Sequence, residues 1–300
     1  MIEVTGLRKE YGAFTAISDL TFSVGNGEIF GIVGPNGTGK TTILKMISGL
    51  IRQTAGTITI KGLDIEQDPL AIRSFLGFLP EESPLYEGME VEKYLLFFAE
   101  LYGVDRHTSL SRINELFYDL SLNPAGKKIG DLSKGMRRKV AIARSLINDP
   151  EVLIYDEPAS GLDPMTSKYI TDYISSLKSI GKTIVFSAHN LYQVERLCDR
   201  ILIMKDGKKI TLGTPEQIRQ EYGTISYRVT FAVDDITGIG SLDIKEDNGH
   251  YLVRTEHIDD VNHITRWVAS KGGDILELRT IEPSLEDIFI ELMKEEQGPE

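Results

Sequence analysis

The stretch GPNGTGKT, residues 34–41, decides the fold. It matches the phosphate-binding pattern G-x-x-x-x-G-K-[ST] at every fixed position. In such a loop the glycines let backbone N–H groups turn inward around phosphates, the lysine reaches the β- and γ-oxygens, and the next hydroxyl ligates Mg²⁺. An apolar strand over 28–33 precedes the loop and a helix over 41–50 follows it, which is the setting the pattern requires. The alternative is a glycine-rich turn without function.

The residues that this loop assigns to nucleotide binding are Gly34, Pro35, Asn36, Gly37, Thr38, Gly39, Lys40, Thr41 and Thr42. Lys40 also counts as catalytic, because it contacts the phosphates whose bond would break.

Polar side chains end two short apolar runs later in the chain. The run 152–155 leads into Asp156 and Glu157, and the run 184–188 leads into His189. Because the carboxyl ends of parallel strands face one crevice, we expect these side chains beside the phosphate loop. Asp156 would pair with Mg²⁺, and Glu157 would accept a proton from the attacking water. The alternatives are solvated acids at a turn and an ordinary surface histidine.

The stretch DLSKGMRRK, residues 131–139, has three interpretations: a capped helix start, a basic patch for nucleic acid, or an anion site. A cap explains Ser133, but not Gly135, which is a poor helix former. Four positive charges near the start of a helix oppose its dipole, at roughly 0.3–1 kcal/mol each. A docked phosphate would turn that conflict into attraction, so we expect an anion site. The four charges are Lys134, Arg137, Arg138 and Lys139.

Composition is that of a globular protein, with 41% hydrophobic and 26% charged residues among 300. The net charge is −12, and residues 222–300 contribute −10 of it through 7 basic and 17 acidic side chains. That acidity disfavours a nucleic-acid partner. A lone Cys198 fits a reducing compartment. No run reaches the roughly 18 apolar residues of a membrane span, and the first residues do not read as a signal peptide, so a membrane contact would need a partner.

The pattern of strands and helices divides the chain into domains 1–221 and 222–300. Strands with turns occupy residues 1–33, and a further alternating strand covers 56–60. A helical block lies at about 85–125, and apolar strands suited to a buried parallel sheet follow. Residues 222–300 read as a small α+β domain, with three alternating strands and two helices. The last helix opens on Pro283-Ser284-x-x-Asp287, a capping-box pattern.

The ordered motifs resemble the nucleotide-binding subunit of an ATP-binding-cassette (ABC) transporter. The resemblance covers residues 1 to about 220 and rests on Tyr11, 34–41, GFLPE (77–81), LSKGM (132–136), 152–157, SGLD (160–163) and His189. The acidic C-terminal segment with EPSLEDIF (282–289) further resembles the ABC-2-type exporter group of drug-resistance and sodium-extrusion ATPases.

The resemblance implies an α/β P-loop ATPase domain with a parallel core sheet, an antiparallel β subdomain and a helical subdomain, plus the small C-terminal α+β domain. It implies ATP and Mg²⁺ as ligands, with the metal held by Thr41, Asp156 and Glu81. Glu157 would be the general base and His189 would contact the γ-phosphate.

Further roles implied by the resemblance concern adenine and a second copy of the chain. Tyr11 would stack on adenine. Ser133 and Gly135 would bind the γ-phosphate held by the opposite subunit, and Asp163 would lie at the dimer seam. Three positions depart from the broad family pattern: Glu81 and Met136 replace glutamines, and Lys134 replaces a glycine.

These roles predict an ATPase whose two copies close head-to-tail around two ATP molecules and drive export. The segment 78–95 would grip a separate integral membrane permease, so the chain would sit peripherally on the cytoplasmic face of the membrane, with no nucleic-acid partner. One alternative is a cytosolic ABC ATPase of DNA repair, iron–sulfur assembly or translation, disfavoured by the single cassette and the modest helical block. Another is an ATP-gated regulatory or self-protection module, which the Asp156–Glu157 pair disfavours.

Overall fold

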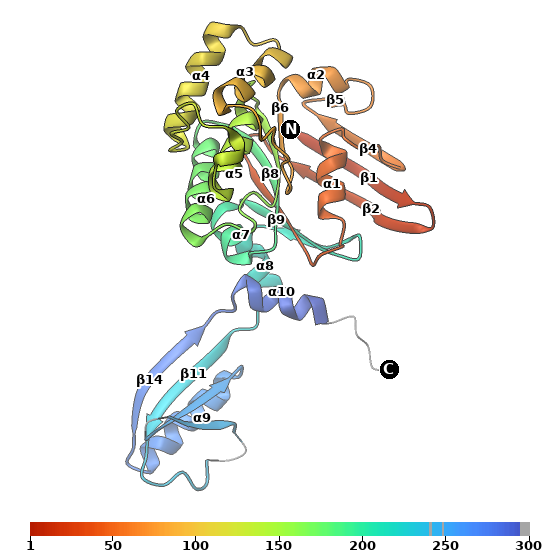
Figure 1. Cartoon of the computed structure of the whole chain (residues 1–300). Helices are drawn as coiled ribbons and strands as arrows, with labels where there is room; N and C mark the ends of the chain where they lie inside the picture. Colours follow the sequence, from red (N-terminus) through yellow and green to blue (C-terminus); the bar gives the residue numbers. More distant parts are fainter. Residues whose placement is uncertain (240–241, 248, 295–300) are drawn as a thin grey trace. The chain divides into compact units, whose positions relative to one another are not determined.

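The computed structural model describes residues 1–239, 242–247 and 249–294. The chain divides into two units, Met1–Pro215 and a second that begins at Glu216 (Figure 1). The division falls at the start of helix α8 (Pro215–Tyr222), whereas the sequence boundary after residue 221 falls near its end. The predicted boundary was placed where the sequence changes to alternating strands. That change comes after α8, so the prediction left most of this helix in the first domain.

A six-stranded sheet forms the centre of the first unit. Its strands run parallel except at one edge, where β10 pairs antiparallel with β9. In order across the sheet they are β10 (Lys208–Gly213), β9 (Arg200–Lys205), β3 (Ile29–Val33), β8 (Thr183–Ala188), β7 (Val152–Asp156) and β6 (Leu76–Leu79). Every residue of β3, β7 and β8 is buried, as expected for parallel strands covered on both faces. The predicted parallel core is confirmed.

A second, antiparallel sheet of the first unit packs against the central one. Its order is β2 (Phe14–Val24), β1 (Ile2–Tyr11), β4 (Ala55–Ile60) and β5 (Leu63–Asp64). Side chains of both sheets and of α1 (Lys40–Ile47), such as Ile17, Ile32 and Ile43, share one hydrophobic core. This packing fixes the loop between β3 and α1 where the two sheets meet.

Helices make up the rest of the first unit. A short α2 (Pro69–Ser74) precedes β6, and α3 (Val91–Leu101) and α4 (Arg106–Asp119) form a layer beside α5 (Lys134–Leu146), with a 3₁₀ turn at Ile129–Asp131 (Figure 1). The predicted helical block over 85–125 coincides with α3 and α4. After β7 and β8 come α6 (Pro164–Ser179) and α7 (Leu191–Leu197), which pack together.

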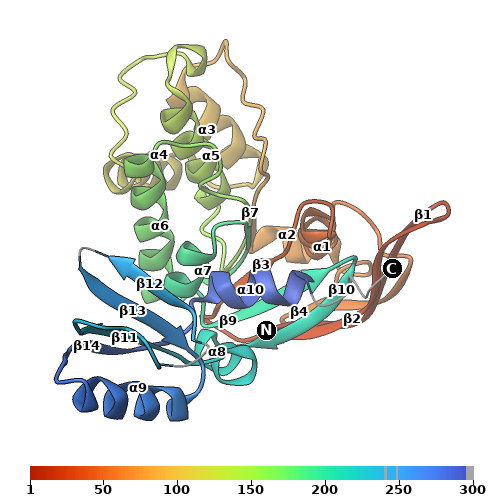
Figure 2. The same ribbon diagram turned by 90° about the horizontal axis from the view of Figure 1, so that it is seen from below.

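The second unit is a four-stranded antiparallel sheet with α9 (Ile258–Ser270) along one face (Figure 2). The strand order is β12 (Ile244–Asp247), β13 (His250–Thr255), β11 (Ser226–Ala232) and β14 (Asp274–Ile281). Val229 and Phe231 pack under α9 in the core. β12 was not predicted, because its residues IKED carry no apolar alternation.

The final helix, α10 (Leu285–Lys294), begins with the predicted capping box. Asp287 N–H donates to Ser284 Oγ at 3.1 Å, and Ser284 N–H donates to Asp287 Oδ2 at 3.1 Å. Each side chain therefore satisfies a backbone donor of the other residue, which is the reciprocal arrangement that the pattern predicts.

Candidate nucleotide site

The phosphate-loop motif lies between the buried end of β3 and the start of α1. Gly39 precedes the helix with φ +95°, and a Cβ there would lie 2.4 Å from Ile17 Cδ1. A Cβ on Gly34 would lie 2.5 Å from the Met204 carbonyl oxygen. Only glycine fits these two positions, because the first needs a left-handed backbone and both need close approach. The loop's path therefore depends on its sequence.

Lys40 points back over this loop. Its Nζ donates to the carbonyl oxygens of Gly34 at 2.8 Å and Pro35 at 3.0 Å. Burial lowers the pKa of Lys40, and the charges of Glu157, Asp156 and Glu81 act in the opposite direction. The ammonium thus lies within electrostatic range of all three predicted carboxylates.

The carboxylates that end β7 are held by a residue that sequence analysis missed. Ser187 is fully buried in β8, and its Oγ donates to Asp156 Oδ1 at 2.5 Å. The same oxygen accepts the Glu157 N–H at 3.0 Å. Glu157 has φ +44°, a left-handed conformation that costs a non-glycine residue about 1–2 kcal/mol. Ser187 therefore fixes one acid and supports the strained backbone of the next.

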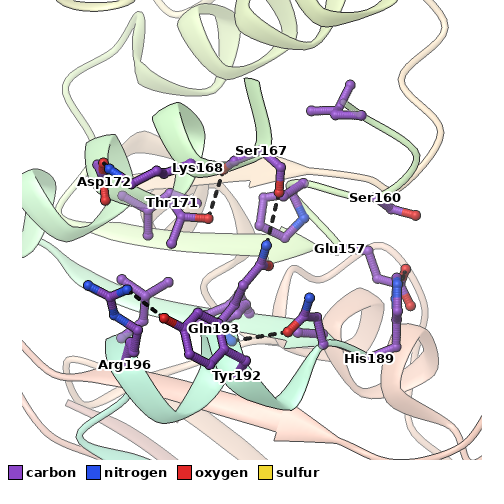
Figure 3. A pocket seen from close by; sticks show the side chains of 18 of the residues that line it. Glu157, Ser160, Ser167, Lys168, Thr171, Asp172, His189, Tyr192, Gln193 and Arg196 are labelled. Carbon is purple, nitrogen blue, oxygen red and sulfur yellow. Dashed lines mark hydrogen bonds and ion pairs between the residues drawn. The ribbon is translucent and has the colours of Figure 1, made fainter. Parts of the chain in front are cut away.

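Glu157 and His189 form a direct pair. Glu157 Oε2 lies 2.8 Å from His189 Nδ1, and the glutamate side chain is 10% exposed against 59% for the histidine. Figure 3 shows the two side chains together near Ser160. The sequence motifs assigned them separate roles and gave no indication of this contact. A carboxylate shielded from water and contacted by an imidazole is an arrangement suited to accepting a proton.

Glu81 follows β6, on the strand next to β7. Desolvation raises the pKa of Glu81, and the nearby charges of Glu157 and Asp156 raise it further. Three carboxylates therefore lie within electrostatic range of one another at the carboxyl ends of β6 and β7.

A cavity of 620 Å³ brings most of the predicted nucleotide residues together. Its lining includes three residues that sequence analysis missed: Phe14, Ala16 and Ser160. Phe14 pairs with Tyr11 across the β1–β2 turn, so the spacing of that hairpin was the available signal. The predicted residues that line the cavity are Tyr11, Asn36, Gly37, Gly39, Lys40, Thr41, Thr42, Glu81, Glu157 and His189.

A neighbouring cavity of 610 Å³ lies between α6, α7 and the segment that follows β7 (Figure 3). Gln193 of α7 donates to Ser167 of α6 at 2.9 Å and ties the two helices together. Glu157, Ser160 and His189 line both cavities. The Glu157–His189 pair therefore lies where the two cavities adjoin.

Ser133, Gly135 and Asp163 do not line the nucleotide cavity of their own chain. Ser133 caps α5, with Oγ accepting the Met136 N–H at 3.3 Å, so the cap interpretation is confirmed. Asp163 caps α6 by accepting the Thr166 N–H at 3.0 Å, and this bonding lowers the pKa of the Asp163 carboxyl. A Cβ on Gly135 would lie 3.0 Å from Thr166 Cγ2. The close approach of α5 to Thr166 of α6 therefore favours glycine at 135, independently of any bound anion.

Protein groups contact three of the four cations of the stretch 131–139, so the clustering of charge does not by itself require an anion there. Arg137 donates to Gly130 and Leu132 carbonyl oxygens and pairs with Glu87 at 2.9 Å. Lys139 lies 4.1 Å from the centre of the Tyr169 ring, and burial lowers its pKa. Arg138 is buried and bonded to backbone carbonyls. The sequence showed that these charges cluster but not which groups surround them.

Over residues 1–239, 242–247 and 249–294, histidine, cysteine and carboxylate side chains form no group of three or more able to hold a metal ion. Within the same residues, each helix is too short or too polar to cross a bilayer.

A phosphate loop on a parallel sheet, with Asp156, Glu157 and His189 at the neighbouring strand ends, defines a P-loop protein of the nucleotide-hydrolase class. Residues 17–160 match the family model for ABC transporters. Residues 213–293 match the model of the C-terminal domain of DrrA1-3-like ATP-binding proteins. The chain belongs to the family of ABC transporter ATP-binding proteins, which confirms the resemblance seen in the motifs.

Named relatives span nearly the whole chain. The linearmycin resistance ATP-binding protein LnrL of Bacillus subtilis (strain 168) is 30% identical over 97% of this chain and 98% of its own length. The Nod factor export ATP-binding protein I of Burkholderia orbicola (strain AU 1054) is 32% identical over 97% of this chain and 96% of its own length. Among solved structures, the dimeric bacterial cassette MJ0796 is 27% identical, with a TM-score of 0.66 over 71% of this chain and 98% of its own. A dimeric post-hydrolysis state of that cassette, bound to ADP and Pi, matches with a TM-score of 0.65, 26% identity, and the same coverage.

Proposed function

We propose that this chain hydrolyses ATP and that the hydrolysis drives export through a separate membrane permease. The observation that carries the proposal is the 2.8 Å contact of Glu157 Oε2 with His189 Nδ1, in the cavity that also contains Lys40. The post-hydrolysis MJ0796 structure supports the reaction, and the resistance and export names of the relatives support the direction.

In this proposal some cavity residues bind ATP and others take part in proton transfer. Lys40 and the loop amides hold the β- and γ-phosphates, and Tyr11 stacks on adenine from the exposed end of β1. Glu157 takes the proton of the attacking water. With Nδ1 of His189 in contact with Glu157, Nε2 is the ring nitrogen left to contact a γ-phosphate oxygen.

Thr41, Asp156 and Glu81 would hold Mg²⁺ beside the phosphates. They are hydroxyl and carboxylate donors, the hard oxygen ligands that Mg²⁺ prefers, and this ion takes its remaining ligands from water and substrate phosphate. Desolvation raises the pKa of Glu81, and the charges of Glu157 and Asp156 raise it further; a bound cation would offset the repulsion among these carboxylates. When bound, the ion would neutralise charge on the phosphate oxygens.

We further propose a head-to-tail homodimer with two ATP molecules between its copies. Ser133 and Gly135 lie outside the nucleotide cavity of their own chain, so the phosphate they contact would be one held by the partner. Asp163 would lie at the seam. ATP then favours the closed dimer, because only that state makes both sets of contacts, and hydrolysis reopens it. The dimeric MJ0796 cassette supports this arrangement.

The permease contact is assigned to segment 78–95 and the adjoining face of α3. Tyr86 is 54% exposed, and its ring lies 5.7 Å from that of Tyr94 and 6.3 Å from that of Phe97. Leu101, the last residue of α3, is also exposed. Tyr94 is buried beneath Tyr86, whereas Tyr86 and Phe97 are exposed, and neighbouring exposed aromatic side chains suit a protein contact. A cytoplasmic helix of the permease would bind here, which places the chain peripherally on the cytoplasmic face of the membrane.

Glu157→Gln tests the proposal. Turnover should fall about 10²- to 10⁴-fold, because the general base is lost. ATP-bound dimers should accumulate and be detected by size-exclusion chromatography. Glu151→Gln makes the same change at an exposed surface ion pair with Lys61 and should leave turnover unchanged.

A Glu157→Gln variant that stays monomeric in ATP and hydrolyses at the wild-type rate would exclude Glu157 as the base. Adding candidate permeases in vesicles separates transport from the cytosolic alternatives. A transport ATPase should be stimulated by its membrane partner, whereas an ATPase of repair or translation should not.

A further inference from the structure

Arg138 is a buried cation whose side chain donates to backbone oxygens of the segments that carry Glu81 and Glu157. Its side chain lies in α5 and the residue is 8% exposed. Burial lowers the pKa of Arg138 to about 10, so the guanidinium still carries its charge at neutral pH. It donates to the carbonyl oxygens of Pro158 (2.8 Å), Pro80 (2.8 Å), Glu81 (2.8 Å), Glu157 (2.9 Å) and Asp156 (3.0 Å), and to Ser83 Oγ (3.3 Å).

The acceptors belong to two loops that follow neighbouring parallel strands. Residues 80–83 follow β6, residues 156–158 end and follow β7, and the two strands pair in parallel register. Only the planar fork of arginine offers five N–H donors in fixed directions, which is what so many carbonyls require. Hydrogen bonds from a charged donor contribute more than neutral ones. Arg138 therefore joins the two loops and connects both to α5.

One of these bonds acts on a strained peptide. Glu157 holds its left-handed conformation while its N–H is bonded to Ser187 and its carbonyl oxygen to Arg138. Such a conformation persists only where the surroundings hold it. The direction of the Glu157 side chain follows from that of its backbone, so the two bonds together aim the carboxylate at its position beside His189.

We propose that Arg138 is a positioning residue that fixes the Glu157 carboxylate relative to the loop 80–83. This inference rests on the proposed function, in which Glu157 is the general base. It assigns Arg138 no contact with ATP: the side chain acts through the backbone of residues 156–158. A displacement of loop 80–83, which lies within the segment 78–95 of the proposed permease contact, is then transmitted to Glu157 through one guanidinium.

The test measures kcat and the KM for ATP in Arg138→Met and Arg138→Lys. The methionine removes all donors, and lysine keeps a charge but not the fork. We expect kcat to fall about 10- to 100-fold in Arg138→Met, less in Arg138→Lys, with the KM for ATP within about twofold of wild type. Arg112→Met is the matched control: Arg112 bonds the Ile147 carbonyl oxygen at 2.8 Å away from the site, and its loss should leave kcat unchanged.

A second arm repeats both Arg138 substitutions in the Glu157→Gln background, with turnover followed over hours. If Arg138 acts through Glu157, the double variants lose less than about twofold beyond Glu157→Gln alone, because the base they would misplace is already gone. Losses that multiply would overturn the inference and indicate a general effect on the fold. Should Arg138→Met fail to fold, Arg138→Lys carries the same comparison.

The two proposals fail separately. A wild-type ATPase that Glu157→Gln inactivates upholds ATP hydrolysis with Glu157 as the general base, whatever the result for Arg138. Against that background, full kcat in Arg138→Met, or a raised KM with kcat unchanged, overturns only the positioning role.

Discussion

Replacing Ser187 by alanine removes two hydrogen bonds that hold the acids at the end of β7. The hydroxyl donates to the Asp156 carboxylate and accepts the Glu157 N–H, in a position closed to water. A bond to a charged group contributes about 1.5–3 kcal/mol, and a buried N–H left unpaired costs about 1–3 kcal/mol. We expect Ser187→Ala to lower the free energy of unfolding of the first unit by about 2–5 kcal/mol. Misplacement of Glu157 should also lower kcat about tenfold or more.

The assay combines urea denaturation with steady-state ATPase measurements. Far-UV circular dichroism follows both units, whereas Trp267, the only tryptophan of the sequence, lies in α9 and reports on the second unit by fluorescence. The matched control is Ser145→Ala. Ser145 is also buried, but its Oγ contacts only the neutral Ile142 carbonyl and Tyr155 hydroxyl, so we expect a loss of about 1 kcal/mol and unchanged turnover.

Equal losses of stability in the two serine variants, together with wild-type kcat in Ser187→Ala, would refute this reasoning. Asp156 and Glu157 would then be held in place without the Ser187 hydroxyl.

Gly39→Ala should abolish ATP binding in an equilibrium titration, because φ +95° and the 2.4 Å approach to Ile17 exclude a Cβ; retained affinity would contradict the loop geometry. The raised pKa of Glu81 means that the folded state holds its proton more tightly than the unfolded chain does. Unfolding free energy in Mg²⁺-free buffer should therefore fall as pH rises from the ordinary carboxyl pKa through the raised value, and a urea-titration series should find that Glu81→Gln removes this fall. Ser284→Ala should destabilise the second unit by about 1 kcal/mol, read from Trp267 fluorescence, without changing ATPase kinetics; an altered kcat would link the cap to the site.

Local chemistry decided which features of the fold and site could be predicted from sequence. The phosphate loop, the acids after β7 and the capping box at Ser284 each depend on neighbours within a few residues, so the sequence contains their whole signal. The buried parallel strands were visible because burial on both faces leaves a continuous apolar run. β12 was missed because its four residues carry no such pattern.

Contacts between residues far apart in the sequence were missed or misinterpreted. Ser187 lies in an apolar run and gives no sign that its hydroxyl faces two residues about thirty positions earlier. Arg138 was counted as one of a cluster of charges at a helix start, but its acceptors come from loops about 20 and 58 positions away in sequence. A sequence shows which groups exist, whereas their partners follow from the order of strands in the sheet.

The close approach of Gly135 to Thr166 has a consequence for how this family can vary. A Cβ at 135 would lie 3.0 Å from Thr166 Cγ2, so a larger residue there requires Thr166 to shift or to be replaced by a smaller residue. Thr166 also supplies the N–H that Asp163 caps. Substitutions at 135 and 166 should therefore be correlated across related sequences, and a backbone shift that accommodates either one would move the starts of two helices together.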